Sequence, residues 1–304
     1  MKINRRQFVR NLGLGTASLS MGSLISTSSC APSGDSRDKR GKVSDDDQFL
    51  FIGDDIAIAQ TEYGKVQGYL LNHVYTFLGV PYGADTSGKN RFMPPQKPEP
   101  WTDVRPAVFY GNTAPQRMEN RWPNNYGTFA DHWNYWDVSE DCLYLNVWTP
   151  GIADGKKRPV LVWLHGGGFT NGSGIEQDGY HGENISREGD IVFCSINHRL
   201  GPIGFSDLSG VGGEAYKDSG NVGMLDIIAA LRWVHDNIAN FGGDPGNVTV
   251  MGQSGGGSKV CTVAAMPAAK GLVHRAVALS GSTVGASDPV SYTHLRAHET
   301  SAHL

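Results

Sequence analysis

A serine between glycines, directly after a short apolar run, constrains this chain more than any other feature. Residues 248–251 read Val-Thr-Val-Met and lead into Gly252-Gln253-Ser254-Gly255-Gly256. Where a strand turns this sharply into a helix, the serine backbone is strained and neighbouring main chain lies close, so positions 252 and 256 cannot carry bulky side chains. The pattern predicts a strand, a tight turn and a helix, with Ser254 at the turn as a nucleophile.

A second glycine-rich segment follows another apolar run upstream. Residues 161–164 read Leu-Val-Trp-Leu and lead into His165-Gly166-Gly167-Gly168. An enzyme that transfers acyl groups stabilises its oxyanion with backbone N–H groups, and glycine lets the main chain approach the substrate closely enough to do so. Such a loop acts together with the N–H of the residue after the nucleophile, here Gly255. A merely flexible loop would not explain why a predicted strand leads into each motif in this order.

The composition argues against several other classes of protein. With 304 residues, of which 39% are hydrophobic, the chain can bury a sizeable core. The net charge is −4 and no long block of Lys or Arg occurs, so we expect no nucleic-acid partner. No run of 18 apolar residues occurs, so we expect no transmembrane helix. We expect neither a metal nor another cofactor, because metal-ligand spacing is absent among Cys30, Cys142, Cys194 and Cys261.

The first 48 residues are expected to lie outside the fold. Residues 1–30 resemble a twin-arginine export signal, in which Arg5-Arg6 precedes a weakly apolar stretch; the alternative is a disordered basic tail. Cys30 is a candidate lipid anchor, although Thr27 stands where a lipobox usually has an aliphatic residue. Residues 31–48 are rich in Ser, Gly, Asp and Lys and are predicted to form a flexible tether. We therefore expect export to the periplasm or the exterior of a bacterium.

Residues 49–289 are predicted to form an α/β domain. Short alternating runs between Phe51 and Leu78 predict an antiparallel β-meander. Strands that alternate with helices farther along the chain imply a mostly parallel central sheet. The predicted elements are buried strands at 143–148, 160–164, 191–196, 248–251 and 276–279, and helices at 224–238 and 257–266.

With these elements in place, the chain resembles the type-B carboxylesterases, a family of α/β-hydrolases that includes cholinesterases and bacterial para-nitrobenzyl esterases. One family signature is residues 140–150, Glu-Asp-Cys-Leu-Tyr-Leu-Asn-Val-Trp-Thr-Pro, and the other runs from residue 241 to the Ser254 segment. The resemblance covers about Ile58 to Ser282, the N-terminal portion of the family's domain. It implies a C-terminally truncated α/β-hydrolase fold with an N-terminal antiparallel meander. It also implies hydrolysis of a small-molecule carboxylic ester.

The resemblance assigns roles to individual residues. It makes Ser254 the nucleophile and Gly167, Gly168 and Gly255 the oxyanion-hole donors. It suggests two structural ion pairs, for which the alternative is solvated surface: Arg91 with Glu140 and Arg199 with Asp226. Many family members pair the cysteine of the first signature with an upstream cysteine. Ala114 stands at that place here, so Cys142 is expected to be unpaired.

The same resemblance leaves Ser254 without a base. In α/β-hydrolases the triad acid and histidine follow the serine in sequence, and the family places both beyond residue 304. His274 is interpreted as a structural residue at the start of the next strand. Residues 290–304 depart abruptly from the family and resemble a translated sequencing adapter, so we expect a non-native tail, although His294 and His298 within it could suggest a metal pair. The 304 residues alone are expected to be inactive.

A non-catalytic binding protein is the alternative to an enzyme. Some cholinesterase-like adhesion proteins of the family lack the serine. In this chain Ser254, its flanking glycines and the His-Gly-Gly-Gly segment are all intact, which favours the enzyme.

Overall fold

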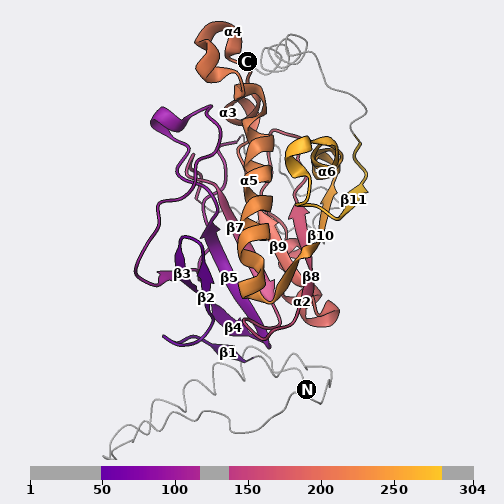
Figure 1. Ribbon diagram of the computed structural model, residues 1–304. Coiled ribbons are helices and arrows are strands. Elements are labelled where there is room, and N and C mark those ends of the chain that lie inside the picture. Colours follow the sequence, from indigo (N-terminus) through magenta and orange to yellow (C-terminus); the bar gives the residue numbers. More distant parts are fainter. Residues whose placement is uncertain (1–48, 117–136, 283–304) are drawn as a thin grey trace, which may run out of the picture. The chain divides into compact units, whose positions relative to one another are not determined.

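The computed structural model describes residues 49–116 and 137–282. Within them, eight strands form one sheet in the order β1-β4-β5-β7-β9-β8-β10-β11 (Figure 1). The order separates an antiparallel half from a parallel half. Three predicted segments lie outside the described residues: the export signal at 1–30, which includes Cys30, the tether at 31–48 and the tail at 290–304. These predictions stay predictions.

The parallel half of the sheet carries both glycine motifs. It consists of β9 (Val192–Ile196), β8 (Arg158–Leu164), β10 (Gly243–Gln253) and β11 (Arg275–Leu279). All five residues of β9 are buried, as expected for a parallel strand covered on both faces. Gly252 of β10 is paired with Leu164 of β8, so the two motifs leave the sheet side by side.

The other half of the sheet is antiparallel. β1 (Leu50–Phe51), β4 (Tyr69–Leu71) and β5 (Val74–Pro81) belong to the predicted meander, and β7 (Tyr144–Thr149) joins them to β9. The apolar sequence of β7 is typical of a buried parallel strand, yet β7 runs antiparallel to both neighbours. Residues 150–157 between β7 and β8 are too short a connection for a helical crossover, so the chain reverses direction there.

Part of the predicted meander lies in a second sheet. β2 (Ile58–Thr61) and β3 (Gly64–Gln67) pair with each other, and β3 also pairs with β6 (Arg105–Pro106). Gly68 stands between β3 and β4, where the chain passes to the main sheet, and a Cβ there would overlap the Thr76 carbonyl oxygen. Sequence alternation predicts the strands but not this division, because the division depends on one close backbone approach.

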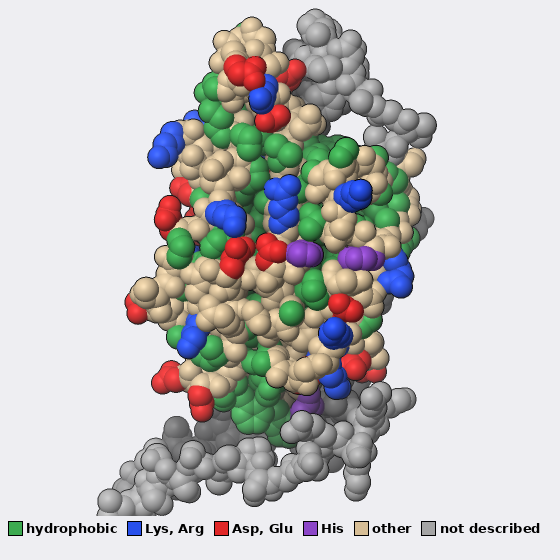
Figure 2. All heavy atoms as spheres, viewed as in Figure 1, with side chains coloured by type: hydrophobic (Ala, Val, Ile, Leu, Met, Phe, Trp, Pro, Cys, Tyr) green, Lys and Arg blue, Asp and Glu red, His purple; other side chains and the backbone are tan. Residues whose placement is uncertain are grey.

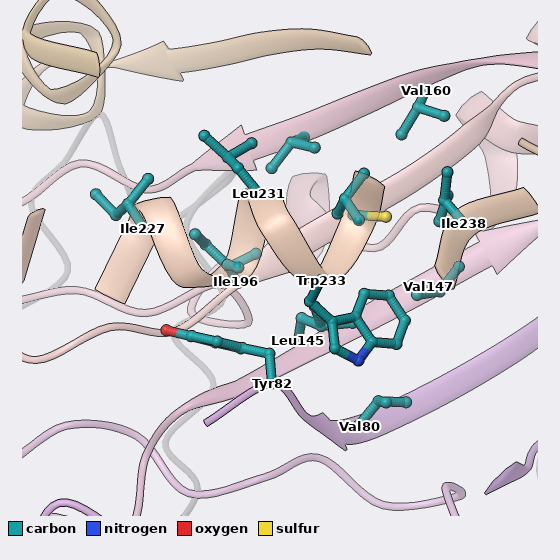
Figure 3. Close-up of a cluster of buried hydrophobic side chains, with 14 of the residues drawn as sticks. Val80, Tyr82, Leu145, Val147, Val160, Ile196, Ile227, Leu231, Trp233 and Ile238 are labelled. Carbon is teal, nitrogen blue, oxygen red and sulfur yellow. The ribbon is translucent and has the colours of Figure 1, made fainter. Parts of the chain in front are cut away.

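The long helix α5 (Val222–Asn237) covers one face of the sheet (Figure 1). Trp233 of this helix lies beside Leu145 of β7 in a buried hydrophobic cluster that also includes Leu231 and Val147 (Figure 3). The turn η5 (Ile238–Phe241) continues the helix. The helix α6 (Gly255–Ala265) follows Ser254 directly and packs on β10 and β11. The predicted α/β architecture is confirmed, with a meander at the N-terminal end and parallel strands around Ser254.

The remaining helices in the described residues are short. None of the described helices is long and apolar enough to cross a membrane. On the face that carries α5, Lys and Arg are interspersed with Asp and Glu (Figure 2). The short elements are α2 (Glu183–Gly189), α3 (Gly201–Phe205), α4 (Ser209–Gly212), η1 (Gly88–Asn90), η2 (Asp178–Tyr180), η3 (Glu214–Tyr216), η4 (Ser219–Asn221) and η6 (Pro267–Ala269).

Both predicted ion pairs are present. Arg91 donates two hydrogen bonds of 2.7 and 2.6 Å to the Glu140 carboxylate near the surface. Arg199 donates two of 2.9 and 2.6 Å to Asp226 of α5, and both of these side chains are fully buried. The second pair therefore fastens α5 to the loop after β9. Cys142 is a buried free thiol, as predicted.

Candidate active site

Ser254 occupies the turn between β10 and α6, as predicted. Its backbone has φ 56° and ψ −122°, a conformation that is strained for any residue other than glycine. The Ser254 amide donates a hydrogen bond of 2.8 Å to the Leu279 carbonyl oxygen of β11, and the Ser258 amide donates one of 3.1 Å to the Ser254 carbonyl oxygen. The strained residue is thus held both by the neighbouring strand and by the helix that follows.

Gly252 and Gly256 are required because the main chain leaves no space for a side chain. A Cβ at Gly252 would lie 2.5 Å from the Gly256 carbonyl carbon. A Cβ at Gly256 would overlap the Leu164 carbonyl oxygen at the end of β8. This confirms the steric interpretation of the motif. It also shows that the start of α6 touches the strand that leads into the second motif.

The predicted oxyanion-hole glycines lie beside this turn. A Cβ at Gly255 would lie 2.5 Å from the Gly168 nitrogen, so the two backbones are in direct contact. Gly167 and Gly168 have φ values of 78° and 62°, in the left-handed region that favours glycine. A Cβ at Gly166 would lie 3.6 Å from the Ser254 Cβ. The structure therefore brings Gly167, Gly168 and Gly255 together at the nucleophile, where backbone donors can act on a bound carbonyl group.

The oxyanion loop, which we define as residues 165–170, is held by hydrogen bonds to its backbone. The Thr170 and Asn171 amides donate to the Gly167 carbonyl oxygen at 3.3 and 3.2 Å. The Gly201 amide donates to the Phe169 carbonyl oxygen at 2.8 Å. At the start of the loop, the buried His165 ring stacks on the His198 ring with 4.9 Å between centroids. Burial, with Lys259 nearby, holds the pKa of His198 well below its ordinary value, so this ring is neutral.

Lys259 is the residue at the site that sequence reasoning missed. It lies on α6 with its side chain fully buried, and its Nζ donates a hydrogen bond of 3.1 Å to the His165 carbonyl oxygen. Burial lowers the pKa of Lys259 to about 7, and the Glu176 carboxylate opposes this shift. A signal was present in the sequence. Lys259 follows Gly255 by four positions and therefore shares its face of a helix that has no other charged residue.

His274 lies away from Ser254, toward the other end of β10. Its Nδ1 accepts a hydrogen bond of 3.2 Å from the Val248 amide. In the sheet register, Arg275 is opposite Thr249, whereas Leu279 is opposite Gln253 next to the nucleophile. The contact with the β10 backbone supports the structural interpretation of His274. In residues 49–116 and 137–282, no group of three or more His, Cys, Asp or Glu side chains could hold a metal ion.

Comparison with known proteins places this arrangement in a family. Residues 55–300 match the carboxylesterase family. The para-nitrobenzyl esterase of Bacillus subtilis (strain 168) is 44% identical over 229 residues, which cover 74% of this chain and 44% of that protein. A phenmedipham hydrolase of Pseudarthrobacter oxydans is 44% identical over 220 residues, which cover 72% of this chain and 42% of that protein.

Solved structures of esterases are also similar to this chain. An esterase of Clostridium hathewayi, described as able to hydrolyse aliphatic aromatic polyesters, has a TM-score of 0.70 at 43% identity and covers 75% of this chain and 44% of its own. A carboxylesterase of Geobacillus stearothermophilus has a TM-score of 0.65 at 42% identity and covers 72% of this chain and 42% of its own. The chain spans less than half the length of each of these relatives. Since the family match extends over residues 55–300 and the fold around Ser254 agrees with it, this chain belongs to the carboxylesterase family.

Proposed function

We propose that Ser254 is the nucleophile of a carboxylic ester hydrolase that works through an acyl-serine intermediate. The observation that carries this proposal is the strained Ser254 beside the backbone contact between Gly168 and Gly255. The Ser254 oxygen attacks the carbonyl carbon of a small ester, and the N–H groups of Gly167, Gly168 and Gly255 stabilise the oxyanion that forms. Loss of the alcohol leaves an acyl-serine, which water hydrolyses to the carboxylic acid and free serine.

This reaction needs a base that takes the Ser254 proton and an acid that orients the base. In α/β-hydrolases both follow the nucleophile in sequence. His274, within residues 255–282, is bound to the β10 backbone at Val248. We therefore propose that the base and the acid come from sequence that follows residue 282.

The test is covalent labelling with an aryl organophosphonate, which modifies activated serines. The 304-residue chain and a form extended by the downstream coding sequence are compared, each with its Ser254→Ala variant. We expect the extended form to be labelled, and Ser254→Ala to lower the labelling rate at least about 10⁴-fold. Ser258→Ala, a substitution one turn along α6, serves as the matched control and should still be labelled.

The labelling result also separates the two candidate functions. Serine-dependent labelling of the 304-residue chain alone would locate the base within residues 283–304, whereas labelling of the extended form alone would locate it in the added sequence. If the extended form shows no Ser254-dependent labelling, the hydrolase proposal fails and a non-catalytic binding protein is favoured.

We also propose that the chain is exported, on the strength of the Arg5-Arg6 pair and the apolar stretch after it. Replacing both arginines with lysine should retain the protein in the cytoplasm. If Cys30 carries a lipid anchor, the Cys30→Ala substitution should release the exported protein from the membrane fraction. Export that is unaffected by the double lysine variant would contradict the proposal.

A further inference from the structure

Lys259 belongs to the helix that begins at the nucleophile, but the proposed reaction does not use it. Its side chain is fully buried, which is rare for lysine unless the ammonium group has specific partners. The Nζ donates a hydrogen bond of 3.1 Å to the His165 carbonyl oxygen. It also lies over the Phe169 ring, 5.7 Å from the centroid. His165 and Phe169 flank the three glycines of the oxyanion loop, so one side chain reaches both ends of the glycine turn.

The partners of Lys259 come from more than one element. His165 ends the β8 segment, His198 stacks on it from the loop after β9, and the buried Glu176 acts on Lys259 electrostatically from the loop after residue 170. A buried ammonium group is stabilised by a carbonyl oxygen, an aromatic face and a carboxylate, and here it has all three. These groups offset part of the cost of burying the ammonium group.

Helix α6 meets the oxyanion loop at two separate points. The first is the backbone contact between Gly255 and Gly168, and the second is the contact of Lys259 with His165 and Phe169, one helical turn farther on. The hydrogen bond from the Gly201 amide holds the far end of the loop. The contacts of Lys259 fix His165 and Phe169 to α6 and so restrict the orientation of the glycines between them. Misplacement of catalytic groups by about 1 Å can lower a rate 10²-fold.

We propose that Lys259 is a positioning residue that fixes the oxyanion loop relative to Ser254 by joining α6 to His165 and Phe169. The catalytic consequence of this inference rests on the proposed ester hydrolysis. Its structural part, the fixing of the loop, does not. Lys259 acts through the loop backbone and does not touch the substrate. Lys259 should therefore contribute more to stabilisation of the transition state, whose oxyanion the loop stabilises, than to substrate binding.

The structural part is tested by hydrogen–deuterium exchange on the 304-residue chain. In Lys259→Met, which keeps the apolar stem and removes the donor, we expect amides of residues 165–171 to exchange at least about 10-fold faster, with α5 and β9 unchanged. Val263→Ala, a buried substitution one turn along α6, is the matched control and should not release the loop selectively. Unchanged exchange at 165–171 in Lys259→Met overturns the proposal.

The catalytic part is tested on whichever form reacts with the phosphonate. Per titrated active site, Lys259→Met should lower kcat about 10- to 100-fold and leave KM within about twofold. A merely structural role would lower the number of titratable sites and leave kcat per site unchanged, which also overturns the proposal. If no form reacts, ester hydrolysis fails, and the exchange experiment still decides whether Lys259 holds the loop. Should Lys259→Met not fold, Lys259→Gln, one atom shorter and uncharged, is measured instead, with the same expected direction and the same overturning results.

Discussion

The nucleophile turn and the oxyanion loop both depend on glycine, but for different physical reasons. At the turn the reason is space, because a Cβ at Gly256 would overlap the Leu164 carbonyl oxygen. At Gly168 of the loop the reason is conformation, whereas at Gly167 both reasons apply, because a Cβ there would also overlap the Asn171 carbonyl oxygen. Gly168 has φ 62°, yet the nearest atom to a Cβ there would be the Thr170 Oγ1 at 3.9 Å. Gly256 and Gly168 look alike in sequence, yet they should therefore tolerate substitution very differently.

The largest effect is expected at the turn. Gly256→Ala should lower the free energy of unfolding by about 3 kcal/mol or more, because backbone has to move to admit the methyl group. Urea denaturation followed by circular dichroism measures this. Gly179→Ala is the control, since a Cβ there meets nothing within 4 Å, and it should change stability by less than about 0.5 kcal/mol. A Gly256→Ala variant as stable as this control would remove the distinction between the two regions.

At the loop we expect a smaller loss of stability and a selective loss of rate. Gly168→Ala should cost about 1–2 kcal/mol, the price of a left-handed alanine, and should slow phosphonate labelling about 10- to 100-fold as the donor shifts. Gly88→Ala is a matched control, because Gly88 has φ 57° and an open surrounding. It should cost similar stability and leave the labelling rate unchanged. If Gly168→Ala destabilises as much as Gly256→Ala, position 168 is limited by space as well.

A third effect depends on pH and concerns Lys259, which joins the two regions. Its pKa is lowered from 10.5 to about 7 by burial. Below pH 7 both the folded and the unfolded states carry the proton, so the cost of the buried charge is fully present. Between about pH 7 and 10 the unfolded state binds more protons, so the stability of the wild type relative to Lys259→Met should rise by up to about 1.4 kcal/mol per pH unit.

This pH dependence is measured by urea denaturation of both proteins at pH 6, 7.5 and 9. Groups that do not interact with Lys259 act equally in the two proteins, so the difference between them reports Lys259 together with its neighbours His198 and Glu176. A stability difference that stays constant over this range would contradict the prediction.

The sequence predicted the elements around Ser254 well, because apolar runs that end in glycine mark both a strand and its turn. The strands predicted at 160–164 and 248–251 lie within β8 and β10. The antiparallel direction of β7 and the second sheet at Gly68 could not be predicted, since each depends on a connection length or a backbone approach in three dimensions. For the same reason the sequence could name Gly167 and Gly168 but could not tell that Gly168 meets Gly255.

The support of the nucleophile by β11 has a thermodynamic consequence. The Ser254 amide donates a hydrogen bond to the carbonyl oxygen of Leu279, which belongs to the neighbouring strand β11 and not to the strand that leads into Ser254. Local opening costs less free energy than global unfolding, so β11 can separate from β10 while α5 and the other strands remain folded. Fraying would release the strained serine and let it relax. Loss of the reactive geometry and loss of the native fold are then two separate equilibria, and the first is governed by a single strand.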